Sequence, residues 1–261
     1  MEYKEIIKNS YYHDDAGMLL KGDCLEVMKD FPDKSIDMIL CDLPYGTTAC
    51  KWDAIIPFAP LWEQYERVIK ENGAICLFGS EPFSSKLRMS NLKLYKYDWI
   101  WNKKLAGNGI LAKKQPLKIH EIVSVFNSKI YYPQKTKGKM RSKMTSGIKT
   151  SEINGGDGIK SCKEYQNDMY YPKSIQEFGI GNMRVGRLHP TQKPVKLIEY
   201  LIKTYTNESE IVLDNASGSC TTAIACKNTN RRWICIEQEE KYCDISVERI
   251  KNYAKTPLEE E

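Results

Sequence analysis

A short motif, Asp42-Leu43-Pro44-Tyr45, directly follows the apolar run of residues 36–41. An exocyclic amine on a nucleobase is a poor nucleophile because its lone pair is delocalised into the ring. Two acceptors that grip its N–H bonds would pull the nitrogen towards a tetrahedral geometry. The Asp42 carboxylate and the Leu43 carbonyl can supply them, and Pro44 stiffens the turn. Tyr45 offers a ring on which an extruded base could stack, worth about 1–3 kcal/mol. The motif predicts catalysis by placement of acceptors, without a metal or a histidine base.

A second group of residues could hold a small ligand where a helix begins. The apolar run 211–213 ends in Asp214, and a turn of small residues then enters a predicted helix near Gly218. Small residues let the backbone approach a ligand at a helix N-terminus. Glu237 ends the next apolar run, about 20 residues beyond the glycine, where an acidic residue can accept hydrogen bonds from a ribose. These features predict a ligand that contains adenosine.

Two adenosine cofactors are candidates. The NAD fingerprint needs three glycines in the pattern G-x-G-x-x-G, and here only Gly218 stands at such a position. S-adenosylmethionine has no phosphate but carries an ammonium and a carboxylate. Asp214 and the hydroxyls of Ser219, Thr221 and Thr222 are suitable partners for those groups.

Either motif alone also fits an ordinary loop, because an aspartate can cap a turn and a strand can pass into a helix without binding anything. Their combination is more informative. Asp42 and Asp214 both end apolar strands, and ligands of open α/β sheets lie outside the carboxyl ends of the strands. If the two strands are neighbours, an amine and a methyl donor would meet at one edge of the sheet.

Apolar runs separated by turn residues predict the elements that position these motifs. Strands are expected over residues 18–21, 36–41, 74–78, 97–101, 121–126, 211–213 and 233–236. Helices are expected over residues 25–28, 58–70, 81–91, 195–205, 217–227 and 240–254. This alternation predicts an α/β fold with a mostly parallel sheet covered on both faces. Trp99, Trp101 and Phe126 are expected in its core.

The middle of the chain lacks this periodicity. Residues 133–187 are rich in Lys, Gly, Ser and Asn and are interpreted as an insertion into a catalytic domain formed by residues 1–132 and 188–261. Their excess of basic residues suits a polyanion such as DNA, and a solvated surface loop explains it equally well. The candidate DNA-binding residues are Lys135, Lys137, Lys139, Arg141 and Lys143, with Lys103, Lys104, Lys113 and Lys114 in an earlier loop.

The composition of the 261 residues narrows the class of protein. Apolar residues make up 41%, enough for a packed core, and no apolar run is long enough to span a bilayer. The polar N-terminus does not resemble a signal peptide, so a cytoplasmic protein is expected. The nine cysteines contain no C-x-x-C pair and are expected to be reduced and buried. With three histidines, a metal site is not expected.

These motifs resemble those of the β class of DNA amino-methyltransferases. In that family the amine-binding motif precedes the cofactor motif, with a target-recognition region between them, and the order is the same here. Gly22-Asp23-Cys24 resembles the family's acidic motif that faces the adenosine, and His-Pro-Thr-Gln-Lys-Pro over residues 189–194 resembles the segment that lines the methionine part of the cofactor. The resemblance implies a Rossmann-like methyltransferase fold with a seven-stranded sheet, a circularly permuted motif order and an inserted target-recognition region.

The resemblance also implies roles for individual residues. The target amine would be held by Asp42, Leu43, Pro44 and Tyr45. S-adenosylmethionine would be bound by Asp23, Cys24, His189, Thr191, Lys193, Asp214, Asn215, Ala216, Gly218, Ser219, Cys220, Thr221, Thr222 and Glu237. Trp52 and Asp53, in the loop after the amine motif, could help to close the pocket. Double-stranded DNA would be the substrate, and the resemblance allows a homodimer and a cognate restriction endonuclease as partners.

Departures from the family pattern bear on the chemistry. The family commonly has D-P-P-Y, and Leu43 replaces the first proline but keeps the carbonyl. The cofactor loop of the family usually has the sequence D-P-F-x-G-S-G, whereas Asn215, Ala216 and Cys220 replace the proline, the phenylalanine and the second glycine. The lost aromatic ring and the added side chain predict weaker cofactor binding. A positive φ at Cys220 would store strain of about 1–3 kcal/mol.

The expected reaction is methylation of N6 of adenine at a specific DNA sequence, after the base has flipped out of the duplex. Methylation of N4 of cytosine uses the same amine geometry, but Asp42 favours adenine because the cytosine enzymes more often have serine there. A catalytically silent DNA-binding protein of the same fold is an alternative suggested by the altered cofactor loop. A nucleotide-dependent oxidoreductase is disfavoured by the missing glycines.

Overall fold

The computed structural model describes residues 3–46, 53–144, 164–180 and 192–253. The chain divides into two compact units, one formed by residues 1–132 and 174–261 and the other by residues 133–173. The smaller unit thus ends before residue 187, where the insertion was expected to end. The reason is that residues 175–177 form a strand in the sheet of the larger unit.

The larger unit is built on one sheet of nine strands in the order β1-β2-β11-β10-β3-β4-β6-β5-β9. The strands are β1 (Tyr12–His13), β2 (Gly17–Lys21), β3 (Ile36–Cys41), β4 (Ile69–Gly79), β5 (Tyr95–Gly107), β6 (Lys118–Phe126), β9 (Ile175–Glu177), β10 (Ile211–Asp214) and β11 (Arg232–Glu237). Neighbours from β2 through β4 are parallel, whereas β6 runs antiparallel to both β4 and β5. The sheet is mostly parallel, as predicted.

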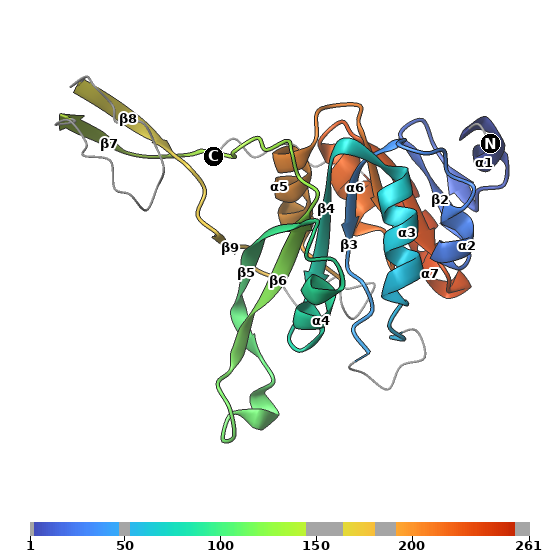
Figure 1. The fold of residues 1–261 in the computed structure, drawn as a ribbon, viewed down its shortest axis with the longest axis horizontal. Helices are drawn as coiled ribbons and strands as arrows, with labels where there is room; N and C mark the ends of the chain where they lie inside the picture. Colours follow the sequence, from blue (N-terminus) through green and yellow to red (C-terminus); the bar gives the residue numbers. More distant parts are fainter. Residues whose placement is uncertain (1–2, 47–52, 145–163, 181–191, 254–261) are drawn as a thin grey trace. The chain divides into compact units, whose positions relative to one another are not determined.

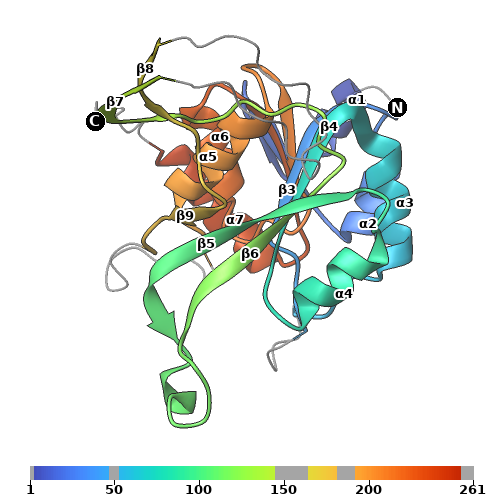
Figure 2. The same cartoon turned by 60° about the vertical axis from the view of Figure 1, so that its left-hand side comes forward.

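Helices cover both faces of this sheet (Figures 1 and 2). They are α1 (Tyr3–Lys8), α2 (Cys24–Met28), α3 (Phe58–Val68), α4 (Phe83–Ser90), α5 (Val195–Tyr205), α6 (Thr221–Asn228) and α7 (Glu240–Lys251), with a 3-10 turn η1 (Gly109–Leu111). Along β4, Ala74, Cys76 and Phe78 share a core with α5, α6 and α7, whereas Ile75 and Leu77 share one with α2, α3 and α4. This alternation gives the sheet an apolar core on each face.

The α/β fold predicted from the sequence is confirmed. All seven predicted strands are present, and the short edge strands β1 and β9 extend the sheet to nine. Helix α3 ends at Val68 rather than at residue 70, because the chain already pairs with β3 at Ile69. Trp99, Trp101 and Phe126 are buried, as predicted.

The smaller unit contains a two-stranded antiparallel ribbon formed by β7 (Thr136–Met144) and β8 (Glu164–Tyr170). Neither strand was predicted, because the segment has no apolar alternation. Cations lie over its aromatic rings: Lys135 is 4.4 Å from the centroid of Tyr171, and Arg141 is 4.0 Å from that of Tyr170. The ribbon therefore presents basic side chains that are partly ordered by ring contacts.

Three predictions from composition can be compared with the described residues. Their seven cysteines are all free and buried, as predicted. None of their helices combines the length and the apolar character needed to cross a membrane. They contain no cluster of three or more His, Cys, Asp or Glu side chains that could hold a metal ion.

Candidate active site

Acidic residues follow four neighbouring parallel strands at one edge of the sheet. Asp23 follows β2, Glu237 ends β11, Asp214 ends β10 and Asp42 follows β3. Strands β10 and β3 pair directly and in parallel. Because the carboxyl ends of parallel strands meet at the same edge, the fold brings the amine motif and the cofactor motif together.

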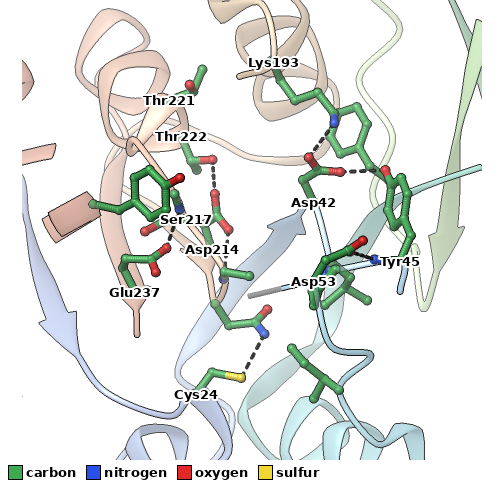
Figure 3. A pocket seen from close by; sticks show the side chains of 18 of the residues that line it. Cys24, Asp42, Tyr45, Asp53, Lys193, Asp214, Ser217, Thr221, Thr222 and Glu237 are labelled. Carbon is green, nitrogen blue, oxygen red and sulfur yellow. Dashed lines mark hydrogen bonds and ion pairs between the residues drawn. The ribbon is translucent and has the colours of Figure 1, made fainter. Parts of the chain in front are cut away.

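A cavity of about 760 Å³ lies at this edge, and both motifs line it (Figure 3). The predicted residues on its wall are Asp23, Cys24, Asp42, Leu43, Pro44, Tyr45, Lys103, Lys193, Asp214, Asn215, Ala216, Gly218, Ser219, Thr221, Thr222 and Glu237. A volume of this size is within the range of about 300–1,000 Å³ that is usual for small-molecule sites. His189 and Thr191, also predicted to bind the cofactor, lie outside the described residues.

Both carboxylate oxygens of Asp42 are engaged by side chains of the protein itself (Figure 3). The Tyr45 hydroxyl donates to Oδ1 at 2.6 Å, and the Lys193 ammonium donates to Oδ2 at 2.5 Å. Tyr45 belongs to the same turn, whereas Lys193 precedes α5, 151 residues further along the chain. An incoming amine would therefore compete with these two donors for the predicted acceptor.

Lys193 is a buried cation between two carboxylates. Its side chain is 9% exposed, and its ammonium lies 2.5 Å from Asp42 and 3.3 Å from Glu121. Burial alone would lower the pKa of Lys193, but the two carboxylates outweigh burial and raise it. Burial alone would raise the pKa of Glu121, but the charges of Lys193 and Lys103 outweigh burial and lower this pKa. Lys193 thus contacts the amine motif, and its contact with the cofactor, implied by the resemblance, stays a prediction.

Asp53 and Phe83 hold the turn that carries Tyr45. The Asp53 carboxylate accepts the backbone N–H groups of Tyr45 at 2.8 Å and of Gly46 at 3.0 Å. The Tyr45 ring stacks on Phe83, with the ring centroids 5.0 Å apart and the planes inclined by 27°. Burial, with the charge of Asp42, raises the pKa of the Tyr45 hydroxyl well above its ordinary value. The hydroxyl therefore remains a proton donor to Asp42. Trp52 lies outside the described residues.

Asp214 is buried and is held by its own loop. The Thr222 hydroxyl donates to Oδ2 at 2.6 Å, and the Ala216 N–H donates to Oδ1 at 3.3 Å. Burial raises the pKa of Asp214 to about 6, although these hydrogen bonds act to lower it. A cation beside this carboxylate would offset the cost of burying its charge. Asp214 is therefore suited to a positively charged group of a ligand.

Glu237 is held by two backbone donors. Its Oε2 accepts the N–H of Gly218 at 2.8 Å, and its Oε1 accepts the N–H of Glu239 at 2.9 Å. Gly218 has a φ of 53°, in the left-handed region that glycine adopts without strain. Burial raises the pKa of Glu237. The carboxylate is thus fixed in the cavity wall, at the position predicted for contact with a ribose.

Cys220 does not line the cavity, contrary to the prediction. It precedes α6 with a φ of 53°, is fully buried, and its Sγ lies 3.4 Å from the Ser217 hydroxyl. Its side chain belongs to the core shared with α5, α6 and α7 rather than to the ligand-facing side of the loop. Weaker cofactor binding through contact with Cys220 is therefore not supported, whereas the condition for backbone strain, a positive φ, is met.

Several partners of the site were not identified from the sequence. Glu121 is the first residue of the predicted strand of residues 121–126, and a carboxylate beside a mostly apolar run could have indicated it. Arg249 of α7 donates to the Ser219 carbonyl at 2.8 Å, and Tyr65 of α3 donates to Asn215 Oδ1 at 2.6 Å. Neither residue differs in its spacing from the other polar residues of its helix, so no pattern distinguishes it.

The predicted DNA-binding residues divide into two groups. Lys103 lies in the cavity wall 3.2 Å from Glu121, and Lys104 pairs with Glu177 at 3.2 Å. Both were candidates for phosphate contacts, which stay predictions, and each pairs with a carboxylate in this structure. Lys104 is nevertheless exposed, as are Lys113, Lys114, Lys135, Lys137, Lys139 and Arg141. The side chain of Lys143 lies outside the described residues.

Known proteins share long stretches of this sequence. Residues 36–248 match the profile of a family described as DNA methylase. The chain is 27% identical to the type II methyltransferase M.BamHI of Bacillus amyloliquefaciens over 260 residues and 27% identical to M.HpaI of Haemophilus parainfluenzae over 251 residues. The two alignments cover 93% and 89% of this chain, and 59% and 73% of the relatives. The chain thus spans about three fifths of the length of M.BamHI.

Solved structures share the fold. A structure of the PvuII DNA methyltransferase, described as cytosine-N4-specific, superposes with a TM-score of 0.67 at 17% identity, over 95% of this chain and 91% of that chain. The M1.HpyAVI–SAM complex superposes with a TM-score of 0.61 at 23% identity, over 91% of this chain and 100% of that chain. The predicted Rossmann-like methyltransferase fold is confirmed. Because the profile match spans most of the sequence, the chain belongs to the DNA methylase family that comprises the N6 and N4 amino-methyltransferases.

Proposed function

We propose that the protein transfers a methyl group from S-adenosylmethionine to N6 of adenine in DNA. The observation that carries this proposal is the meeting of Asp42 and Asp214 in one cavity, at the ends of adjacent parallel strands. The first carboxylate is suited to the N–H bonds of an amine, and the second to a cationic ligand. A methyl donor and an amino acceptor need such a pair of neighbouring sites.

The residues around Asp214 fit S-adenosylmethionine. The sulfonium and ammonium groups of this cofactor are cationic, and Asp23, Asp214 and Glu237 line this part of the cavity. Glu237 is fixed by backbone donors where a ribose needs an acceptor. When bound, the cofactor would supply an electrophilic methyl group: the bond from sulfur to the methyl carbon would break as the bond from nitrogen forms, the sulfur would leave as a neutral thioether, and one amine proton would pass to Asp42. The small side chains from Ala216 to Ser219 leave room for it along the wall.

The amine motif would hold the target nitrogen. In this proposal Asp42 Oδ1 and the Leu43 carbonyl accept its two N–H bonds, so that its lone pair leaves conjugation and turns towards the cofactor. The amine takes the place of the Tyr45 hydroxyl on Oδ1, and the Tyr45 ring stacks against the base. Lys193 stays on Oδ2, where it keeps the carboxylate oriented.

Basic side chains outside the cavity would bind the DNA backbone. Lys113 and Lys114 are exposed beyond β5, and the ribbon of β7 and β8, with the residue before it, exposes four further basic residues, two of which lie over aromatic rings. Each phosphate contact should steepen the fall of log affinity with log salt by about 0.9. In this proposal the ribbon contributes to recognition of the target sequence. A homodimer and a cognate restriction endonuclease stay predictions from the resemblance.

Cytosine N4 is the second candidate for the acceptor atom. It is favoured by the likeness to a structure described as cytosine-N4-specific, and it needs the same two acceptors for its amine. Adenine is preferred because the first residue of the amine motif is Asp42 rather than serine. The methylated nucleoside recovered from the DNA distinguishes adenine N6 from cytosine N4.

The test is to incubate the protein with unmethylated DNA and S-adenosylmethionine that carries a deuterated methyl group. The DNA is then digested to nucleosides, which are identified by mass spectrometry. We expect deuterated N6-methyldeoxyadenosine, and none with Asp42→Ala. Deuterated N4-methyldeoxycytidine would replace the adenine assignment. Sound DNA binding in a gel-shift assay without a labelled nucleoside would favour a catalytically silent protein.

A further inference from the structure

The hairpin formed by β5 and β6 extends beyond the edge of the sheet where the cavity lies. Strand β5 runs in the same direction as β4, because both are antiparallel to β6. It therefore leaves the sheet on the side where Asp42 follows β3. Figures 1 and 2 show this hairpin continuing well past the ends of the neighbouring strands.

The base of this hairpin forms part of the cavity wall. Trp101 and Lys103 of β5, and Glu121 of β6, line the cavity. Glu121 also contacts Lys193, which holds Asp42. The hairpin thus leads outward from the predicted site of the target amine.

The tip of the hairpin is apolar and exposed. Ile110 is fully exposed, and Leu105 and Leu117 are 49% and 46% exposed. The turn that presents Ile110 is ordered by hydrogen bonds: Asn108 accepts the N–H of Leu111 on its carbonyl at 2.8 Å and the N–H of Lys118 on its side chain at 2.8 Å. Large apolar side chains that are exposed on an ordered, protruding turn indicate a surface that contacts another molecule.

The charge around this tip selects the kind of partner. Residues 103–118 contain five lysines and no acidic residue, and Lys113 and Lys114 are exposed. A second copy of the chain would bring the same cations against them and be repelled. A DNA duplex instead offers phosphates to the lysines and a stacked apolar interior to the isoleucine.

From these observations we propose that Ile110 is a wedge that enters the base stack beside the target and fills the space left when the base moves into the cavity. The inference rests on the proposed function. Unstacking and unpairing a base costs a few kcal/mol, and an inserted apolar side chain replaces part of the lost stacking. Lys113 and Lys114 would hold the flanking phosphates.

The experiment compares Ile110→Ser with the wild type on two duplexes, after the target sequence has been found by sequencing DNA that the wild type has methylated. One duplex has the target base paired, and the other has it opposite an abasic site, so that it is already unpaired. On the paired duplex we expect kcat/KM of Ile110→Ser to fall by about tenfold or more. On the abasic duplex it should stay close to the wild-type value. Met89→Ser, which alters a 68% exposed methionine of α4 outside the cavity, is the matched control.

Two results would overturn the wedge. One is an equal loss, or no loss, on both duplexes. The other is a halved molar mass of Ile110→Ser in light scattering without DNA, which would make the tip a contact between copies of the chain. If the wild type methylates neither duplex nor any other DNA, the proposed function fails first and the wedge fails with it. Circular dichroism of the variant verifies that it is folded.

Discussion

The two halves of the cavity differ in what holds their carboxylates. On the cofactor side, Asp214 and Glu237 accept hydrogen bonds from backbone N–H groups of the loops that follow β10 and β11, and Asp214 also accepts one from the hydroxyl of Thr222 in the first turn of α6. On the amine side, the oxygens of Asp42 are held by the side chains of Tyr45 and Lys193. Backbone donors can leave only if the loop itself rearranges, whereas side chains can leave by changing rotamer.

This difference implies that the cofactor half of the cavity is preformed. In the amine half, protein side chains occupy the acceptor oxygens that a substrate amine would use. Preformed acceptors reduce the entropy lost when a cofactor binds. On the other side, Tyr45 and Lys193 keep Asp42 from being a partly buried carboxylate without side-chain partners while no base is present. The amine half should therefore rearrange at each turnover, and the cofactor half should not.

Removing the charge of Asp42 should abolish most of the methylation activity without weakening cofactor binding. In Asp42→Asn the amide offers one acceptor oxygen and directs an N–H group at its neighbours, so we expect kcat for methylation to fall by about 1,000-fold. Cofactor affinity, measured by isothermal titration calorimetry, should change by no more than about twofold, because the residues that donate hydrogen bonds to Asp214 and Glu237 are not those that donate to Asp42. A parallel loss of cofactor binding would show that the halves are not separate.

Lys193→Met should affect the same half through stability and orientation. It leaves Asp42 and Glu121 without their shared cation, so we expect the free energy of unfolding to fall by about 3 kcal/mol in urea titrations. The same change should reduce kcat by about tenfold or more, since Asp42 loses its fixed orientation.

The double variant Lys193→Met, Glu121→Gln is the control for this experiment, because it also removes one of the two negative charges that Lys193 offset. It should recover part of the stability but little of kcat. If Lys193→Met instead weakens cofactor binding and leaves kcat unchanged, then Lys193 belongs to the cofactor half.

Asp214→Asn tests the cofactor half of the cavity through the pH dependence of the free energy of unfolding. The pKa of Asp214 is raised from 3.8 to about 6 by burial, so the unfolded chain loses this proton at a lower pH than the folded chain. Stability therefore decreases as pH rises from about 4 to 6 and stays lowered above that range. We expect Asp214→Asn to stabilise the ligand-free protein at pH 8 by on the order of 2 kcal/mol.

Cofactor affinity should respond in the opposite sense. In the wild type it should weaken below pH 6, by about tenfold for each pH unit, as Asp214 becomes protonated. In Asp214→Asn it should be weaker and nearly independent of pH. A wild-type affinity that is flat between pH 5 and 7 would mean that Asp214 does not pair with a cation of the cofactor.

The smallest expected effect concerns Cys220, which has a left-handed backbone beside the preformed loop. Glycine relieves the strain of this conformation and alanine does not, and both remove the buried thiol. We expect Cys220→Gly to be more stable than Cys220→Ala by about 1 kcal/mol in thermal or urea unfolding. This order reverses the usual helix preference of the two residues. Equal stabilities would show that the backbone at this position is relaxed.

Much of the sheet could be predicted because its strands are short apolar runs that end in turn residues. The same signal placed Asp42 and Asp214 at strand ends, and the parallel sheet brought them together. The ribbon of β7 and β8 could not be predicted, because strands whose described side chains are mostly exposed lack the apolar alternation that the prediction needs.

The interior of the site was harder to predict than its position. The contact between Lys193 and Asp42 spans 151 residues of sequence, and only the folded sheet determines it. Family resemblance assigned Lys193 to the cofactor because of its neighbours in the chain, whereas the structure places its ammonium between two carboxylates. The side on which Cys220 lies depends on a single backbone torsion, which the residue type alone does not determine.

The most direct test of the account is a crystal structure of the protein with a non-transferring analogue of S-adenosylmethionine and a duplex that contains the target sequence. We predict the target amine nitrogen within about 3 Å of both Asp42 Oδ1 and the Leu43 carbonyl. The Tyr45 hydroxyl should have left Oδ1, Lys193 should remain on Oδ2, and the analogue should lie against Asp214 and Glu237. The account would be contradicted by a flipped base whose amine lies away from Asp42 while the Tyr45 hydroxyl still donates to Asp42 Oδ1.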